Sequence, residues 1–352
     1  MKLKIDYESK DFPPSYNVGS GTLSTSWDDL LWAAITVGRP NTWYFSPHSP
    51  ASLSGGFSSI YNQDFEILED KWEEILCKIT SKGQPNIQRF LRYGLPSLYD
   101  ALFRLSLIRM AVKRDPSGYL RHTDAFKSLD PTEKGMVSYF LGMTLCKLFA
   151  SKFLCTPWTL HLDVFFPDLK SALGRKSRPD LVGKDCIGRW HVFECKGRSG
   201  ALSSDDKKKA KSQAKSVNSI DGTHCYLHIG SFAFFKFEKG SERLRFYWAD
   251  PEPDEQKSID LLAPDKEWRH YYEPALSLAI GIPFTQRLAD ISVEIHPKIQ
   301  SFLVEEQWNR AHTEAQEMRE FLLDEGYRED GLKVSLGPSW DEQGDERSER
   351  SE

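Results

Sequence analysis

Residues 178–196 read RPDLVGKDCIGRWHVFECK, and this stretch decides the fold. Aromatic and β-branched residues at 190–196 predict a β-strand, and residues 178–182 predict a second strand before it. The segment 183–188 begins and ends with glycine and supplies the turn between the two strands. The sequence therefore predicts an antiparallel hairpin with charged residues near its open end.

The charged side chains of this hairpin are predicted to converge. Side chains alternate along a strand, so Glu194 and Lys196 point to one face and Cys195 points to the other. With the turn centred near residue 187, Asp180 lies across the hairpin from Glu194, within reach of a shared cation. Two carboxylates and the backbone carbonyl of Cys195 offer the hard oxygen ligands that Mg²⁺ prefers, with water completing its shell. The sequence thus predicts a magnesium site at Asp180, Glu194 and Cys195.

The predicted site suits the hydrolysis of a phosphodiester. That reaction needs a metal that polarises the phosphoryl oxygen and activates a water, and a cation near the charge that develops. Lys196 is placed for the second task. It either stabilises the oxyanion or orients the attacking water, and the sequence leaves both roles open.

Arg178-Pro179-Asp180, thirteen further residues and then Glu194-Cys195-Lys196 form a spaced motif. It resembles the PD-(D/E)xK signature of restriction endonucleases and related nucleases, over about a third of the chain. The resemblance implies the α/β class, with a restriction-endonuclease-like core made of a mixed central sheet flanked by helices. It also implies that Asp180 and Glu194 bind Mg²⁺, for which Mn²⁺ can substitute, and that Lys196 assists catalysis. The alternative interpretation of the same residues is a surface salt bridge on a hairpin.

Two further residues are candidates for the same site. Members of this superfamily often add an acidic residue from the first core helix, which here is Glu133, although a capping box begun by Asp130 explains the same residue. Several related families carry a Gln on the helix after the E-x-K motif, and Gln213 lies on the expected sheet-facing side of that helix. Val217 stands where those families have Tyr, so this chain departs from their pattern.

The order of helices and strands divides the chain into four expected segments. In the second segment, a capping box at Asp130–Glu133 begins a helix that ends near Leu154. After it we expect strands at 158–166, 178–182 and 190–196, a Lys-rich helix at 204–217, and strands at 224–235 and 243–248. The segments are a mixed, partly helical N-terminal region at 1–127, the nuclease core at 128–252, a helical region at 253–338, and a disordered acidic tail at 339–352.

The most regular helix of the C-terminal region is predicted at Ile299–Leu323. Apolar residues recur along it in steps of three and four: Trp308, Ala311, Ala315, Met318 and Leu322. This stripe predicts packing against the core or against a partner, either another protein or a second copy of the chain.

The composition fits a globular protein that binds a polyanion locally. The 352 residues carry a net charge of −5, but residues 170–215 hold thirteen Lys/Arg against five Asp/Glu. Six cysteines at irregular spacings, without a CxxC pair, predict reduced thiols rather than a zinc site or a disulfide framework. No apolar run approaches the ~20 residues of a membrane span, and the first residues lack a signal-like apolar stretch. We therefore expect a cytoplasmic protein without membrane contact.

Together these features predict a metal-dependent nuclease that hydrolyses DNA phosphodiester bonds. The resemblance implies a role in bacterial or phage defence, restriction or mobile-element biology. Two alternatives stay open: a nuclease-like fold that only binds nucleic acid or protein, and a subunit of a multiprotein complex that is inactive alone. The sequence shows no helix-turn-helix or zinc-finger pattern that reads bases, and it does not separate DNA from RNA.

Overall fold

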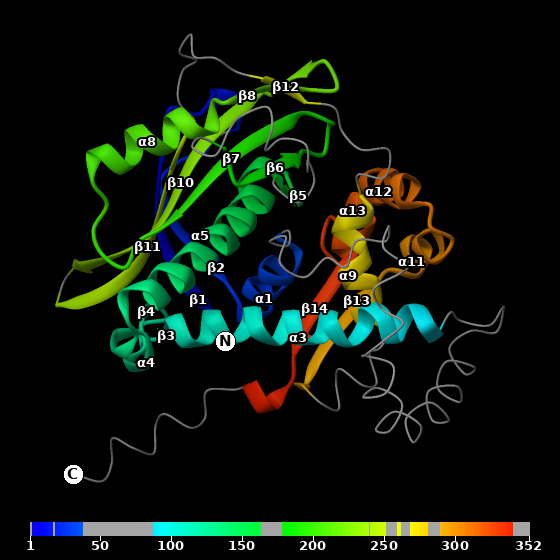
Figure 1. Ribbon diagram of the computed structural model, residues 1–352, viewed down its shortest axis with the longest axis horizontal. Helices are drawn as coiled ribbons and strands as arrows, with labels where there is room; N and C mark the ends of the chain where they lie inside the picture. The colour runs from blue at the N-terminus through cyan, green and yellow to red at the C-terminus, as the bar shows by residue number, and fades with distance from the viewer. Residues whose placement is uncertain are drawn as a thin grey trace, which may run out of the picture.

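The computed structural model centres on one seven-stranded mixed β-sheet (Figure 1). The strand order in this sheet is β2-β1-β11-β10-β7-β6-β5. The strands span Leu3–Lys10 (β1), Gly21–Thr25 (β2), Trp158–His161 (β5), Leu181–Lys184 (β6), Trp190–Gly197 (β7), Leu227–Glu238 (β10) and Ser241–Ala249 (β11). The structure describes residues 2–16, 18–37, 87–162, 178–238, 240–250, 259–261, 268–280 and 289–340.

Strand β7 lies inside the sheet, antiparallel to β6 and parallel to β10. β10 and β11 form a long antiparallel hairpin, and β1 pairs in parallel with β11. Between β7 and β10 the chain passes through helix α8 (Ser204–Ala214), as a connection between parallel strands requires. The expected mixed sheet flanked by helices is confirmed, and the predicted hairpin forms part of it.

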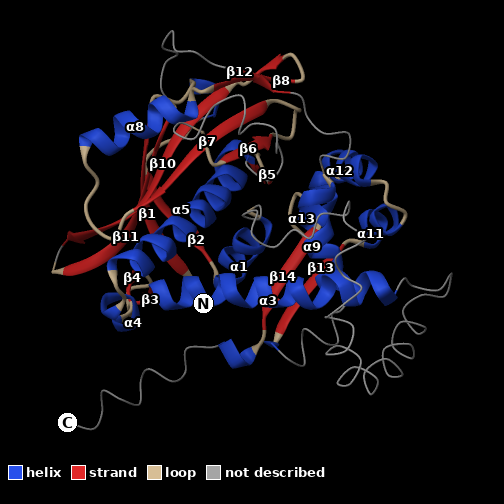
Figure 2. Cartoon of the chain, in the orientation of Figure 1, coloured by secondary structure: helices blue, strands red, loops and turns tan. Residues whose placement is uncertain are grey.

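Helices α5 (Pro131–Leu154) and α8 pack on opposite faces of the sheet (Figure 2). Ala210 of α8 packs against Phe232 of β10, and the strand register places Phe232 beside Lys196 of β7. Cys195 points to the other face, where it meets Cys146 of α5. Because side chains alternate along β7, its charged residues lie on the face that α8 covers.

The helix predicted from Asp130 is confirmed as α5. Asp130 is its N-cap and accepts hydrogen bonds from the backbone N–H groups of Thr132 (2.6 Å) and Glu133 (3.1 Å). The helix ends at Leu154, and its C-cap Cys155 has a left-handed φ of 53°. By length and composition α5 could span a membrane, but 78% of its apolar window is buried inside the fold. Its apolar residues therefore serve the protein core.

The residues before α5 contribute two strands to the central sheet, so the boundary expected at residue 127 divides one sheet. β1 pairs with β11, and β2 pairs with β1 along the sheet edge. The other elements of this region are η1 (Pro14–Tyr16), α1 (Trp27–Thr36), α3 (Ile87–Ala111), β3 (Val112–Arg114), β4 (Leu120–His122) and α4 (Asp124–Ser128).

The region after β11 mixes strands with helices, which corrects the expectation of helices alone. Its helices are α9 (Arg269–Ile280), α11 (Pro297–Val304), α12 (Trp308–Glu317) and α13 (Arg319–Asp324), followed by the single turn η3 (Pro338–Trp340). β13 (Ile291–Ile295) pairs with β14 (Leu332–Leu336), and β12 (Ile259–Leu261) joins β8 (Val217–Ile220) and β9 (Thr223–His224) in a small sheet. The single helix predicted at 299–323 is wrong, because Glu306 adopts a left-handed φ of 60° that interrupts it.

The apolar stripe predicted on that helix packs inward all the same. Four of its members are buried in the core, namely Trp308, Ala311, Ala315 and Leu322. The chain itself therefore covers this stripe. A partner would have to use another face.

The start of the predicted acidic tail is ordered. Ser339 donates a backbone hydrogen bond to Asp290 (2.8 Å), and the indole of Trp340 donates to the carbonyl of Ala289 (2.7 Å). The disordered tail predicted from residue 339 is therefore wrong for its first two residues, and residues 341–352 lie outside the described part.

Two cysteines correct the expectation of reduced thiols. Cys155 and Cys186 form a disulfide, with their Cα atoms 5.6 Å apart. Cys146, Cys195 and Cys225 are buried cysteines outside any disulfide, as expected, and Cys77 lies outside the described residues. The sequence spacing gave no sign of this pair because the fold, rather than the local chain, brings the two residues together.

A buried polar network joins α1 and α5 to α9 and Asp330 of the C-terminal region. Asp330 accepts hydrogen bonds from the indole of Trp32 (2.8 Å) and the hydroxyl of Tyr271 (2.6 Å). Lys147 donates to that hydroxyl (2.9 Å) and to the carbonyl of Pro157. Burial lowers the pKa of Lys147 to about 7, although Asp330 opposes this shift.

The lowered pKa of Lys147 makes stability depend on pH. At pH values between about 7 and 10.5, the ordinary pKa of lysine, Lys147 is protonated more often in the unfolded chain than in the folded protein. The folded state therefore gains stability as the pH rises through this range. We expect the free energy of unfolding of the wild type to rise by up to about 1.4 kcal/mol per pH unit relative to Lys147→Met. Urea unfolding at pH 7, 8 and 9 measures the difference, and the exposed Lys208→Met is the control. A constant difference between wild type and Lys147→Met would contradict the prediction.

Candidate functional site

The structure brings Asp180 and Glu194 together as the sequence predicted. Leu181 pairs with Phe193, so the antiparallel register continues to Asp180 opposite Glu194. The backbone N–H of Asp180 donates to the Phe193 carbonyl (3.0 Å), and the Cys195 N–H donates to Asp180 Oδ2 (2.7 Å). These bonds fix the Asp180 carboxylate at the open end of the hairpin.

Glu194 is fully buried, which is unusual for a carboxyl group. Its pKa is raised to about 8, mainly by desolvation and also by the charge of Asp180, while the ion pair with Lys196 opposes the shift. Apart from the ion pair with Lys196, neither carboxylate oxygen of Glu194 accepts a hydrogen bond from the described residues. Two adjacent carboxylates with one partly exposed lysine form a site that is short of positive charge.

The carbonyl of Cys195 points toward the same place. In a strand the N–H and C=O of one residue face the same neighbour, and the Cys195 N–H faces Asp180. Strand β6 begins only at Leu181, so this carbonyl lies beyond the paired part of the hairpin. Two carboxylates and a carbonyl, with orphaned oxygens on buried Glu194, fit the donor set of Mg²⁺ or Mn²⁺.

Tyr139 of α5 belongs to the site, although no sequence pattern pointed to it. Its hydroxyl donates to Asp180 Oδ1 (2.9 Å), so each oxygen of Asp180 accepts one hydrogen bond. Burial and the nearby Asp180 raise the pKa of Tyr139, which keeps the hydroxyl protonated as a donor. No local motif signals this contact, because it depends on how the helix docks against the sheet.

Two glycines allow that docking. A Cβ on Gly142 would lie 2.8 Å from the carbonyl carbon of Lys196, and one on Gly197 would collide with the backbone of Ser138. Helix α5 therefore approaches the end of β7 backbone to backbone. This contact positions the main chain at the Lys196 carbonyl and Gly197.

The structure does not bring Glu133 to this site. Its carboxylate accepts a hydrogen bond from the backbone N–H of Asp130 (3.1 Å), which completes the capping box. At about 100° per residue, the contact residues Ser138 and Gly142 lie about 140° and about 180° around the helix from Glu133. Glu133 is exposed on the side of α5 away from β7. The structure thus favours the capping role over the catalytic one.

Gln213 lies on the correct helix and near the correct face. Gln213 lies three residues after Ala210 on α8. Ala210 contacts the backbone of Gly230, and Gly230 pairs with Glu194 in the neighbouring strand. The side-chain oxygen of Gln213 is buried and accepts no hydrogen bond among the described residues. The structure records no contact between Gln213 and the carboxylates, so its site role stays a prediction.

Comparisons with known proteins identify no relative. No protein-family model, curated protein or solved structure matches this chain significantly. Geometry at Asp180, Glu194 and Lys196 is therefore the basis for assigning a function.

Proposed function

We propose that this protein is a metal-dependent nuclease with a restriction-endonuclease-like core that hydrolyses DNA. The observation that carries the proposal is the convergence of Asp180, Glu194 and the Cys195 carbonyl, with Lys196 paired to Glu194. A buried carboxylate beside a second carboxylate stabilises the apo fold poorly, so the arrangement is better explained by a bound divalent cation.

Each residue has a defined task in this proposal. Asp180, Glu194 and the Cys195 carbonyl would hold Mg²⁺ or Mn²⁺, which supplies Lewis acidity and lowers the pKa of a bound water. Lys196, whose side chain is 24% exposed, reaches both Glu194 and solvent. It places a positive charge beside the phosphoryl oxygens as their charge increases. Tyr139 holds Asp180 in one orientation.

The choice of a nucleic-acid substrate rests on charge around the site. Helix α8 covers the face that carries Glu194 and Lys196, and it exposes Lys208 and Lys209. Exposed lysines on the helix that covers the site suit a phosphate backbone, which they bind without reading bases. DNA is the substrate we propose, in the cytoplasm, in defence, restriction or mobile-element biology.

Cleavage assays with the full chain test the proposal. Supercoiled, linear and single-stranded DNA, and RNA, are incubated with Mg²⁺, Mn²⁺ or EDTA, beside Asp180→Ala. We expect cleavage of DNA with either metal and none with EDTA or in the variant. Cleavage that survives in Asp180→Ala would reject the site. DNA binding without cleavage under every condition would favour the nuclease-like binding subunit.

Tyr139→Phe tests how Asp180 is positioned. The variant removes only the hydroxyl that donates to Asp180, so the fold should persist while the ligand gains freedom. We expect Mn²⁺ to bind about tenfold more weakly, as for other residues that orient a metal ligand. Isothermal titration with Mn²⁺ gives the affinity, and Tyr99→Phe, at an exposed tyrosine, is the matched control. Equal affinities in all three proteins would show that the contact does not position the ligand.

A further inference from the structure

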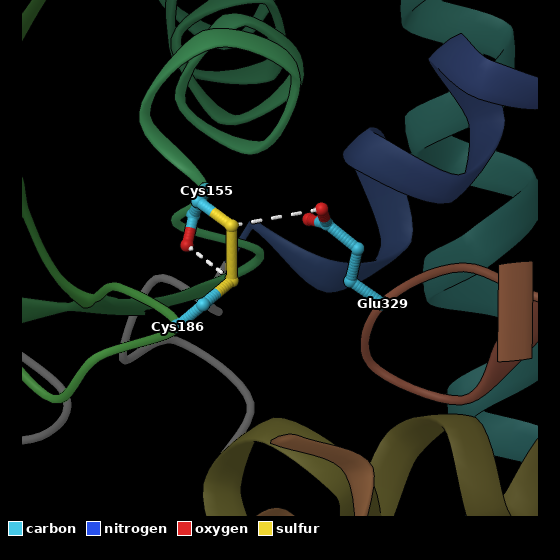
Figure 3. Close-up of side chains that lie close together, drawn as sticks. All are labelled: Cys155, Cys186 and Glu329. Atoms are coloured by element: carbon cyan, nitrogen blue, oxygen red, sulfur yellow. Dashed lines mark hydrogen bonds between the residues drawn. A yellow bond between two sulfur atoms is a disulfide. The ribbon is translucent and has the colours of Figure 1, made fainter. Parts of the chain in front are cut away.

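The disulfide Cys155–Cys186 lies away from Asp180 and Glu194, but it joins two elements that position these residues. Cys155 is the C-cap of α5, and Cys186 lies in the turn between β6 and β7 (Figure 3). We propose that this pair is a site of reversible thiol–disulfide exchange with low-molecular-weight thiols. The proposal does not depend on the nuclease function.

Each sulfur of the disulfide lies near an oxygen that could accept a hydrogen bond from the reduced thiol. Cys186 Sγ lies 3.0 Å from the carbonyl oxygen of Cys155, and Cys155 Sγ lies 3.8 Å from Glu329 Oε1 (Figure 3). Each thiol would therefore find a hydrogen-bond acceptor without rearrangement of the backbone. Both cysteines are partly exposed, so a small thiol can reach them.

A metal site is the competing explanation for the same three side chains. Cys155, Cys186 and Glu329 offer atoms within 4.8 Å of one another. However, the guanidinium of Arg319 donates twice to Glu329 Oε1, at 2.9 and 2.6 Å, and this is the oxygen nearest to Cys155. A cation there would displace Arg319 or lie beside its positive charge. The geometry thus favours exchange between thiols and a disulfide.

The electrostatic environment sets the direction of the exchange. The C-terminus of α5 disfavours a thiolate on Cys155, and the Glu329 carboxylate, whose charge the ion pair with Arg319 partly offsets, acts in the same direction. An external thiolate that attacks Cys155 Sγ therefore expels Cys186 as the better leaving group, which then takes a proton. A second external thiol attacks the mixed disulfide and releases Cys155. The two electrons come from the external thiols, which become one disulfide, and oxidation reverses each step.

The structural consequence falls on the hairpin that carries Asp180. The oxidised pair closes a loop with a sequence separation of 31 residues, and Asp180 lies within that loop. Reduction removes the covalent link between the turn and the end of α5, leaving the hydrogen bond from the Cys186 N–H to the Cys155 carbonyl (2.9 Å). Tyr139, in the N-terminal half of α5, still contacts Asp180. We expect the reduced protein to melt about 5 °C below the oxidised protein, because reduction increases the entropy of the unfolded chain by opening this loop.

Equilibration of the full chain in glutathione buffers of varied reduced-to-oxidised ratio tests the proposal. After acid quenching, alkylation and peptide mass spectrometry report the state of each cysteine. We expect Cys155 and Cys186 to lose their thiols together and regain them when the ratio is reversed, with a midpoint inside the tested range. Cys225→Ser should keep this transition, and Cys186→Ser should abolish it. A pair that stays oxidised, or stays reduced, at every ratio would overturn the proposal.

Two further measurements separate the alternatives. Glu329→Gln removes the charge beside Cys155, so we expect dithiothreitol to reduce the disulfide at least threefold faster, while Glu325→Gln, at an exposed position nearby, changes little. Equal rates in Glu329→Gln and the wild type would contradict the proposed role of the carboxylate. Binding of one Zn²⁺ per reduced chain, lost in Cys155→Ser, would replace exchange with a metal site.

Discussion

Glu194→Gln is expected to lower metal-dependent cleavage by at least ~10³-fold while raising the melting temperature of the metal-free protein. The substitution keeps the shape of the buried side chain and removes one of two adjacent negative charges. The folded-state pKa of Glu194, about 8, lies above its ordinary value of 4.5. Its ionised form therefore costs stability as pH rises from 4.5 through 8, and Gln removes that cost.

The combination of lost activity and gained stability is what identifies a functional carboxylate. Calorimetry at pH 8 with EDTA measures the stability, and a fluorescent DNA substrate with Mg²⁺ measures the cleavage rate. If the metal-free variant melts below the wild type, Glu194 is a structural residue and the proposed role is wrong. Unchanged cleavage would have the same meaning.

Lys196→Met provides the matched comparison. Lys196 is proposed to act on the substrate and not to ligate the metal, so Mn²⁺ affinity should persist. Loss of one charge that stabilises the transition state is expected to cost about 10²–10³-fold in rate. Loss of metal binding in Lys196→Met would show that the lysine holds the ligands in place instead.

The sequence predicted the hairpin well because local physics decides it. Alternation along Trp190–Lys196 and a turn bounded by two glycines fix which side chains share a face, and the observed register follows the predicted turn centre near residue 187. The same holds for α5, where Asp130, Pro131 and Glu133 form an N-terminal signal that acts over a few residues.

Contacts made at long range could not be predicted in this way. β1 enters the central sheet beside β11, more than two hundred residues later, and nothing in its local pattern selects that neighbour. Tyr139 and the Cys155–Cys186 disulfide likewise depend on how α5 lies against the hairpin. Helical spacing alone predicted one helix at 299–323, because the pattern continues across the break at Glu306.

Asp330→Ala is expected to destabilise the fold by about 3–5 kcal/mol, the largest stability effect that we predict. Asp330 is fully buried, and its carboxylate accepts from Trp32, Tyr271 and the backbone N–H of Leu332 (3.0 Å). Alanine would leave these donors buried without their acceptor and would remove the negative charge near Lys147.

The location of Asp330 explains why one side chain should matter so much. Its donors come from α1, α9 and the start of β14, so the carboxylate links the N-terminal region to the C-terminal region across the core. Urea unfolding followed by tryptophan fluorescence measures the effect, and Asp324→Ala, at an exposed aspartate, is the control. If Asp330→Ala lowers the free energy of unfolding by less than about 1 kcal/mol, its effect is no larger than that of an ordinary surface substitution. The network would then be a consequence of packing between these regions and not a cause of it.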